Sequence, residues 1–347
     1  MSLSQSIKQR FPHVPLSHSP TPLERMDNLS KGFTCADGQV NLWIKRDDCT
    51  GLGGGGNKAR QLEFYVGEAV ERGADTLLTT GAVQSNHVRM TVAAARKMGM
   101  HCEIQQESRV PNRPQEYYRS GNPFLVHMMG ATIHNYPHGE DEEGADRALY
   151  KIAEDLVQQG RSPYVVPLSP THRPIGALGY ILAAEELLEQ AKDIDIDTIV
   201  LASGSGTTHA GLLTGLRALR CQAKVVGICV RRPAKLQKPR IIERCQALND
   251  MLGLPNLVEE TDVVLNDAVL APGYGALNES VYRAIFDTAK AEGLLLDPTY
   301  TGKAMAGLFA LLEAQAFKAG ENVIFLHTGG LPGAFGYPEL LAYPPSA

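Results

Sequence analysis

Short apolar runs alternate along this chain with segments of helical hydrophobic periodicity, and this alternation limits the possible folds more than any other feature. It is typical of βα units, in which parallel strands are joined by helices that cover the sheet. Strands are predicted at residues 76–80, 102–104, 164–168, 198–202, 224–228 and 322–326, and helices at 86–97, 177–191 and 209–219. We therefore expect an α/β protein with mostly parallel open sheets flanked by helices.

The size and composition of the chain allow two domains, each with its own core. Of its 347 residues 44% are hydrophobic and 20% are charged, which is an ordinary balance for a globular protein. The least regular region is 108–143, which is rich in Pro, Arg and acidic residues. We interpret this region as a solvated excursion between elements.

The charge of the chain argues against strongly acidic partners. The formal net charge is -5 at pH 7 and the isoelectric point is near 6.1. A chain without a basic surface has little attraction for nucleic acid or an anionic membrane, so we expect neither. No run of about 18 apolar residues occurs and the first residues lack a signal-peptide core, which favours the cytoplasm. A homodimer is expected as the commonest soluble assembly.

A glycine-rich tract ends in a lysine at the start of a predicted helix. The tract Gly51-Leu52-Gly53-Gly54-Gly55-Gly56-Asn57-Lys58 is followed by apolar residues at helical spacing, which places Lys58 in the first turn. Backbone N–H groups at a helix start disfavour a cationic charge. The Lys58 amine could therefore be neutral and nucleophilic.

Two phosphate-binding motifs come close to this tract. Residues 51–56 fit G-x-G-x-x-G, but a run of five glycines in six positions fits that pattern easily, and the preceding run ends in charges. A nucleotide P-loop needs lysine directly after the last glycine and then Ser or Thr, whereas here Asn57 intervenes and Ala59 follows. The simplest alternative is a solvated lysine on a glycine-rich surface loop.

Polar or glycine-rich loops follow four of the strand-like segments. Ligands of parallel sheets bind at such exits, because the loops gather at one edge and helix N-termini point their N–H groups toward it. The sharpest exit is Ser203-Gly204-Ser205-Gly206-Thr207-Thr208, whose small residues would let a phosphate approach the backbone. The other exits are residues 80–87, where Ser85 could be a helix N-cap, 296–303 and 327–330.

No metal site is expected. The six cysteines form no C-x-x-C pair, which leaves no sign of a zinc knuckle or a disulfide framework. His134 and His138 have the spacing of a helical metal pair, but Pro137 between them would break that helix.

The ordered set of these motifs resembles the fold type II enzymes of pyridoxal 5'-phosphate, whose fold is like the β subunit of tryptophan synthase. The closer resemblance is to the D-cysteine desulfhydrase and 1-aminocyclopropane-1-carboxylate deaminase family. It implies a large cofactor-binding domain of residues 1–54 and 166–347, with a small domain of residues 55–165 inserted into it. The matching segments cover nearly the whole chain: PTPLE at 20–24, IKRDD at 44–48, GGNK at 55–58, QSNHVR at 84–89, GALGY at 176–180, PGYG at 272–275 and residues 296–305.

The resemblance also implies a role for each matching residue. Lys58 resembles the lysine that binds the cofactor covalently and later moves a proton at the substrate Cα. Ser85 and Asn86, followed by His87, resemble the turn that holds the substrate carboxylate and the 3'-oxygen of the cofactor. The phosphate cup is matched by Gly204, Ser205, Gly206, Thr207 and Thr208, and the two active-site tyrosines by Tyr274 and Tyr300.

Thr301 resembles the partner of the pyridine nitrogen. A threonine hydroxyl stabilises a protonated pyridinium less than a carboxylate does, which moderates the electron sink and suits elimination of a good β leaving group. In the deaminase branch an acidic residue follows the corresponding tyrosine. Thr301 therefore argues against opening of a cyclopropane ring and favours the cysteine-type lyases.

One loop departs from the family pattern. Desulfhydrases of this family usually read G-G-S-N before the GALGY motif, whereas residues 168–175 of this chain include His172 and Arg173. Either these side chains face solvent, as charged loop residues usually do, or one of them meets a second anion on the substrate. A family relative with such a substrate is L-cysteate sulfo-lyase, which eliminates sulfite.

We therefore predict a pyridoxal-phosphate lyase that removes the β substituent of a cysteine-like amino acid and gives pyruvate and ammonia. L-Cysteate is the leading substrate and D-cysteine is the alternative, with 1-aminocyclopropane-1-carboxylate less favoured. A non-catalytic small-molecule binding protein on the same fold is the alternative of a different class. The predicted substrate contacts are Ser85, Asn86, His87, His172 and Arg173.

Overall fold

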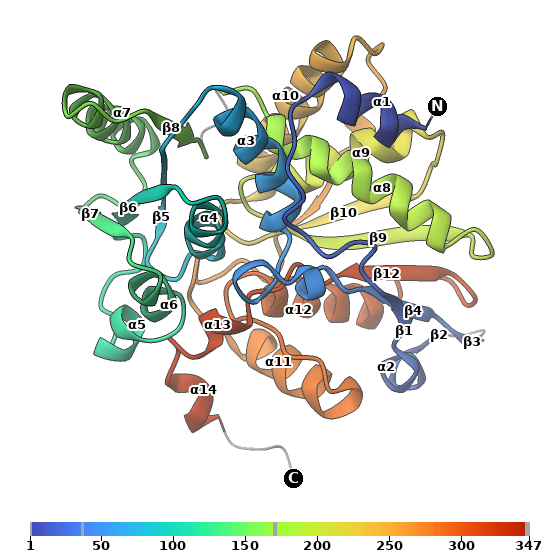
Figure 1. Ribbon diagram of the computed structural model, residues 1–347. Helices are drawn as coiled ribbons and strands as arrows, with labels where there is room; N and C mark the ends of the chain where they lie inside the picture. Colours follow the sequence, from blue (N-terminus) through green and yellow to red (C-terminus); the bar gives the residue numbers. More distant parts are fainter. Residues whose placement is uncertain (1, 36–37, 169–171, 344–347) are drawn as a thin grey trace.

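A computed structural model of the protein describes residues 2–35, 38–168 and 172–343. Within these ranges the chain forms a six-stranded sheet, a four-stranded sheet and a short hairpin, with helices packed on the sheets (Figure 1). The predicted α/β class, with parallel-rich sheets, is confirmed. No helix in the described ranges is long and apolar enough to cross a membrane.

The six-stranded sheet has the order β1-β4-β12-β9-β10-β11, and all its pairs are parallel except β1 with β4. Its strands are β1 (Leu23–Arg25), β4 (Asn41–Lys45), β12 (Asn322–Leu326), β9 (Ile196–Ser203), β10 (Lys224–Cys229) and β11 (Val264–Asn266).

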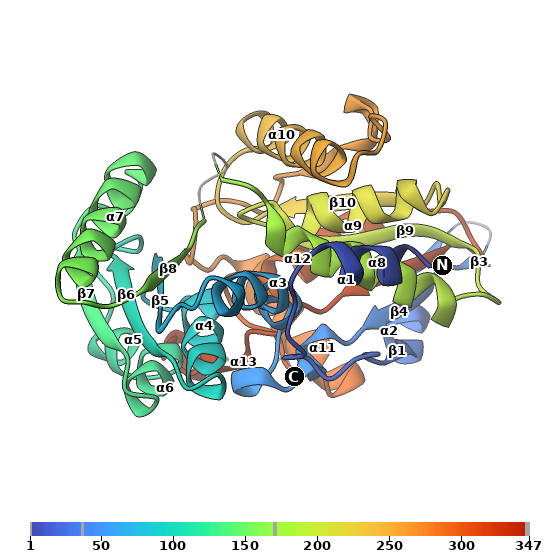
Figure 2. The ribbon, with the colours of Figure 1, turned by 45° about the horizontal axis from the view of Figure 1, so that its top comes forward.

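Both faces of the six-stranded sheet are covered by helices (Figures 1 and 2). On β9, Ile199 and Leu201 belong to one apolar cluster and Val200 to another, because successive side chains of a strand point to opposite faces. The first cluster includes residues of α8 (Leu178–Gln190), α9 (Thr207–Ala218) and α10 (Ala234–Leu252). The second includes residues of α2 (Asp27–Gly32), α11 (Glu279–Glu292) and α12 (Thr301–Glu313).

The four-stranded sheet is parallel throughout and has the order β7-β6-β5-β8. Its strands are β7 (Thr132–Tyr136), β6 (His101–Glu107), β5 (Thr76–Ala82) and β8 (Pro163–Val166), and its helices include α3 (Lys58–Glu71), α4 (Asn86–Lys97) and α7 (Glu142–Gln158). This sheet lies beside the larger one in Figure 1. We propose that it forms the core of the small domain at residues 55–165.

The remaining elements are short and lie mainly at the ends of the chain and in connections. They are α1 (Leu3–Arg10), β2 (Thr34–Cys35), β3 (Gly38–Gln39), η1 (Asp47–Thr50), η2 (Leu52–Gly54), α5 (Gln115–Arg119), α6 (Asn122–Met128), η3 (Ile175–Ala177), η4 (Glu260–Asp262), α13 (Leu331–Ala334) and α14 (Glu339–Ala342).

The interpretation of residues 108–143 as a solvated excursion is wrong. This region contributes α5, α6 and the strand β7, which pairs with β6 in parallel register. The strand is at the sheet edge and its side chains are exposed or only partly buried, so it has no apolar alternation by which the sequence could reveal it.

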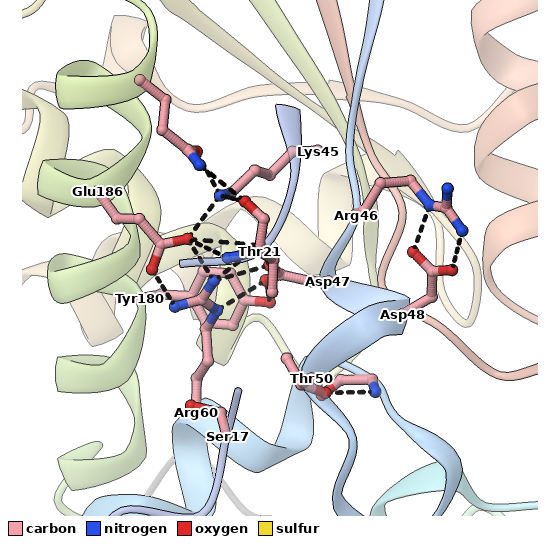
Figure 3. A network of polar contacts seen from close by, with 12 residues as sticks. Ser17, Thr21, Lys45, Arg46, Asp47, Asp48, Thr50, Arg60, Tyr180 and Glu186 are labelled. Carbon is pink, nitrogen blue, oxygen red and sulfur yellow. Dashed lines mark hydrogen bonds and ion pairs between the residues drawn. The ribbon is translucent and has the colours of Figure 1, made fainter. Parts of the chain in front are cut away.

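A buried polar network joins the start of α3 to the large sheet and to α8 (Figure 3). Arg60 binds both oxygens of Asp47, at 3.1 and 2.9 Å, and both oxygens of Glu186, at 2.9 and 2.8 Å. Tyr180 donates to Asp47 at 2.6 Å, and the Lys45 amine donates to the backbone carbonyl of Thr21 at 2.6 Å. Because Asp47 precedes the glycine tract and Arg60 follows it, the network closes the loop that carries Lys58.

Candidate active site

A cavity lies where the carboxyl ends of strands from both sheets meet. Residues that follow five different strands line it: Ser85 after β5, Arg109 after β6, Gly204 after β9, Arg231 after β10 and Thr328 after β12. This is the edge at which parallel sheets bind ligands. Among the predicted site residues, the lining includes Lys58, Ser85, Asn86, His87, Gly204, Ser205, Gly206, Thr208, Tyr274 and Tyr300.

The glycine tract makes a tight turn that delivers Lys58 to this cavity. Gly55 has a φ of 81°, and a Cβ there would lie 1.8 Å from the carbonyl oxygen of Asp48, so a larger residue cannot occupy the position without moving the backbone. The hydroxyl of Thr50 fixes the end of the turn by bonding the amide of Gly56 at 2.7 Å. The tract is therefore a positioned loop rather than a flexible surface segment.

Lys58 is the first residue of α3, and its side chain is partly exposed, toward the cavity that it lines. Its amine donates to Gln61 Oε1 at 3.2 Å, and Gln61 in turn donates to the hydroxyl of Thr208 at 2.8 Å. Burial among protein atoms, followed by the charge of Arg244, lowers the pKa of Lys58 to about 8. A larger fraction of this amine is therefore neutral at physiological pH than for an ordinary lysine.

This lowered pKa predicts how the rate at which Lys58 of the cofactor-free protein binds an aldehyde depends on pH. Only the neutral amine is nucleophilic, so the rate should rise with pH and level off above about 8. The rate is measured by adding pyridoxal phosphate at a series of pH values and recording the change in visible absorbance. A lysine derivative free in solution is the control, and its rate should continue to rise toward about 10.4. A protein profile that follows the control would contradict the burial argument.

The turn after β5 presents Ser85, Asn86 and His87 to the cavity. Ser85 is the N-cap of α4, where its hydroxyl accepts from the amide of Val88 at 3.2 Å. Arg89 holds Asn86 through a bond to Asn86 Oδ1 at 2.8 Å, and the same guanidinium donates to the carbonyl of Gly55 at 2.9 Å. This turn and the glycine tract are therefore fixed to each other, with the N–H groups of α4 at the cavity edge.

The hydrogen bonds of His87 fix its tautomer. Thr79 donates its only hydroxyl proton to the carbonyl of Val166 at 2.9 Å, so His87 Nε2 must donate to Thr79 Oγ1, at 2.9 Å. Within the described ranges His87 Nδ1 is buried without a partner and is left as an acceptor. Burial, followed by the charges of Lys58 and Arg109, lowers the pKa of His87 to about 3 and keeps the ring neutral.

The loop between β9 and α9 has the form of an anion cradle. Gly206 is the N-cap of α9 with a φ of 91°, and no side chain in the described part of the chain caps the helix. The first-turn N–H groups of a helix have no intrahelical acceptor, so an anion placed there would receive them. Thr208, in the first turn, also accepts from Asn57 Nδ2 at 2.9 Å, which links the cradle to the lysine turn.

The two predicted tyrosines meet at another side of the cavity. Their hydroxyl oxygens lie 2.6 Å apart, so one proton joins the pair and the other remains available to a ligand. Burial raises the pKa of both Tyr274 and Tyr300. Both phenols are therefore protonated at neutral pH and can act as donors.

Four predicted site residues are not in the cavity lining: Thr207, Thr301, His172 and Arg173. The hydroxyl of Thr301 is buried and donates to Asp297 Oδ1 at 2.8 Å. A different threonine, Thr328, lines the cavity. His172 and Arg173 line a separate surface groove, in which the Arg173 side chain is 63% exposed and 3.9 Å from Glu68. The structure therefore does not bring His172 or Arg173 to the lysine.

Three arginines in the lining were not predicted from the sequence: Arg109, Arg231 and Arg240. Arg109 and Arg231 each lie two residues beyond the end of a strand, β6 and β10. The rule that ligands bind at strand exits, had it been applied to these two strands, would have found both residues.

The lining fits the cofactor that the sequence resemblance implies. Gly204 lacks a Cβ where one would lie 3.3 Å from Val230, and the uncapped start of α9 leaves amide donors for a phosphate. Lys58 supplies a partly neutral amine across the same cavity. The described ranges contain no group of His, Cys, Asp and Glu residues able to hold a metal ion.

Comparison with known proteins gives consistent relatives. A D-cysteine desulfhydrase of Klebsiella pneumoniae is 41% identical over 329 residues, which is 94% of this chain and 97% of the relative. A D-cysteine desulfhydrase of Yersinia enterocolitica is 40% identical, and the match covers 97% of this chain and 99% of the relative. A crystal structure of an ACC deaminase homologue is 35% identical, covers 99% of each chain and has a TM-score of 0.86.

More distant structures share the fold alone. That of O-ureido-L-serine synthase is 16% identical with a TM-score of 0.66, covering 94% of this chain and 93% of that one. The sequence pattern of the family described as pyridoxal-phosphate dependent enzymes matches residues 14–329, which is nearly the whole sequence. The chain therefore belongs to the family of pyridoxal-phosphate dependent enzymes.

Proposed function

We propose that this protein is a carbon–sulfur lyase that eliminates the β substituent of a cysteine-like amino acid, with D-cysteine as the leading substrate. The observation that carries the proposal is the set of relatives named D-cysteine desulfhydrase, which match almost end to end at 40–41% identity. This reverses the order expected from the sequence, in which L-cysteate came first. That order rested on His172 and Arg173, which line a different groove.

The residues of the cavity support such a reaction. Pyridoxal phosphate, when bound, supplies the electron sink for the pair left at the substrate Cα. The amine of Lys58, whose pKa burial lowers to about 8, is suited to take the Cα proton near neutral pH. Ser85 and Asn86 open α4, whose first-turn N–H groups suit the substrate carboxylate.

The tyrosine pair suits the leaving group. Because only one proton is needed for the 2.6 Å contact between Tyr274 and Tyr300, the second phenolic O–H can donate a hydrogen bond to a departing thiolate. The raised pKa values of both phenols keep them protonated, and therefore donors, at neutral pH. Each residue thus has a task that its environment favours.

Other substrates and classes are less well supported. L-Cysteate is the second candidate, because of the arginines in the lining. 1-Aminocyclopropane-1-carboxylate is suggested by one solved relative, the ACC deaminase homologue. A non-catalytic binding protein would have little use for a lysine with a lowered pKa facing an anion cradle. For assembly we propose a homodimer, which light scattering would test.

The test is to incubate the cofactor-loaded protein with D-cysteine and, separately, with L-cysteine, and to measure pyruvate and sulfide. We expect both products in equal amounts from D-cysteine. Absence of pyruvate from D-cysteine, from L-cysteate and from the uncharged probe 3-chloroalanine, in both enantiomers, would overturn the proposal of a β-elimination lyase.

A further inference from the structure

We propose that Arg109, Arg231 and Arg240 form an oxyanion subsite in the cavity, which takes amino acids whose β substituent is a sulfonate. The inference rests on the proposed function and concerns the substrate class of the same site. It also assigns the second-anion contact to residues different from His172 and Arg173.

The lining of the cavity is cationic on balance. Among described residues it contains these three arginines and Lys58 but no Asp or Glu. The carboxylates of Glu107, Glu142 and Asp146 instead line a smaller void next to it, and Arg109 and Arg231 border both spaces. The guanidiniums of Arg109 and Arg231 therefore stand between the carboxylates and the place where a ligand would bind.

The carboxylates orient the guanidiniums without neutralising all of them. Arg109 makes a two-pronged pair with Glu107, with both bonds at 2.8 Å. Glu142, on α7, is shared by three guanidiniums, those of Arg231 at 2.8 Å, Arg232 at 2.6 Å and Arg240 at 3.0 Å. Three cations thus surround one partly buried carboxylate.

Burial and the excess of positive charge in this cluster lower the pKa of one of its members, Arg232. Burial, followed by the like charges of Arg231 and Arg240, lowers the pKa of Arg232 to about 10. A further carboxylate, Glu140, lies 3.3 Å from Arg231, but its side chain is 69% exposed, so solvent screens it. An anion bound in the cavity would relieve the repulsion.

Two donors of the cluster have no acceptor. The Nε–H groups of Arg231 and Arg240 are buried without a partner among the described residues. The Arg231 side chain as a whole is only 8% exposed. Leaving a buried donor of a charged group unpaired is costly, and native structures rarely do so without a reason. Guanidinium geometry matches oxyanions, so a sulfonate in the cavity that these arginines line is a suitable partner for them.

The cluster has a cofactor side and a substrate side. Arg232 donates to the carbonyl of Gly204 at 3.2 Å and Arg244 to that of Ser205 at 3.0 Å, so these two arginines contact the phosphate cradle. Arg109 and Arg231 instead line the same cavity as Tyr274, whose hydroxyl lies 2.6 Å from that of Tyr300. The proposed subsite is therefore on the side of the leaving group.

The chemistry of such a substrate needs no additional reactant but water. The Cα–H and Cβ–S bonds break, a Cα–Cβ double bond forms, and the C–S electron pair leaves with sulfur as sulfite. Hydrolysis of the resulting enamine gives pyruvate and ammonium. The guanidiniums would stabilise the sulfonate in the bound substrate and the growing negative charge on the departing sulfite.

The test compares L-cysteate with 3-chloroalanine, whose β substituent is uncharged, in the wild-type protein and in the variants Arg231→Gln and Arg109→Gln. We expect the ratio of kcat/KM for cysteate to that for 3-chloroalanine to fall by about 10- to 100-fold in each variant, the effect of one lost charged hydrogen bond. Arg147→Gln, on the exposed face of α7, is the matched control and should leave the ratio within about threefold. Calorimetry should show weaker binding of 3-sulfopropionate, which cannot react, in the two variants.

Several outcomes would overturn the subsite. Wild-type protein that releases pyruvate from 3-chloroalanine but none from cysteate would reject it while leaving the proposed lyase intact. An equal loss on both substrates would give the arginines a structural role. Weaker binding of pyridoxal phosphate by Arg231→Gln, by the same factor as the loss on cysteate, would assign the cluster to the cofactor phosphate. A selective loss in Arg173→Gln instead would return the contact to the surface loop.

Discussion

Replacing Lys58 by alanine should abolish turnover, with a loss of at least about 1,000-fold in kcat, because the variant lacks both the covalent attachment point and the base at Cα. The physical basis is the position of the residue: it begins α3, lines the cavity and has a pKa lowered to about 8. Pyruvate release under saturating cofactor measures the loss. A variant that retains more than about a tenth of the activity would remove Lys58 from catalysis.

Lys303 provides an internal comparison for Lys58. Burial also lowers its pKa to about 8, but its amine donates to the carbonyls of Leu270 and Gly273, and it does not line the cavity. A lowered pKa alone is therefore insufficient, and access to the cradle must decide which lysine reacts. Borohydride reduction of the loaded protein followed by peptide mapping should place the pyridoxyl label on Lys58 and leave Lys303 unlabelled.

Elements with strong hydrophobic patterns could be predicted from the sequence. The bounds of α4 and β12 agree with the expected ranges 86–97 and 322–326, because both elements are packed against a core that requires apolar periodicity. The strand β7 could not be predicted in this way, since its pairing with β6 is made by backbone groups and leaves most of its side chains outward. Edge strands depend on tertiary partners that a local window does not contain.

Site residues could be predicted where the backbone conformation of a turn determines their position. They could not be predicted where several side chains compete for the same hydrogen-bond partner. Glycines before Lys58 and around Ser205 mark turns that only small residues permit, and those segments do reach the cavity. The hydroxyl of Thr301, in contrast, is bound by Asp297 four residues earlier, a choice between partners that no spacing rule decides. His172 and Arg173 could not be placed because the direction of a loop depends on packing elsewhere.

The buried network around Arg60 explains how a tract of five glycines can hold a reactive group still. Such a tract loses much backbone entropy on ordering, and something must offset that loss. Arg60 and Asp47 close the loop from both sides, and Glu186 ties it to α8 (Figure 3). Two cations, Lys45 and Arg60, balance the two carboxylates, Asp47 and Glu186, through three ion pairs.

Replacing Arg60 by methionine should lower the free energy of unfolding by about 3–5 kcal/mol, because it leaves two carboxylates with only Lys45 to compensate them. The matched control is Arg72→Met at the C-cap of the same helix. The Arg72 side chain is 61% exposed beside Glu68, so this change should cost less than about 1 kcal/mol. Denaturant unfolding of cofactor-free protein measures both.

If Arg60→Met fails to fold, the milder Tyr180→Phe removes one hydrogen bond, at 2.6 Å, to Asp47. This variant should cost about 1–3 kcal/mol, the effect of leaving part of a buried carboxylate unsatisfied. Because the network positions the turn that carries Lys58, it should also slow cofactor incorporation, while Arg72→Met should not. The contrary result is equal stability of the Tyr180→Phe and Arg72→Met proteins, with unchanged incorporation rates in both. It would mean that the glycine turn is held by contacts within the loop, such as the 2.7 Å bond from the Gly56 amide to the Thr50 hydroxyl, and not by the charges behind it.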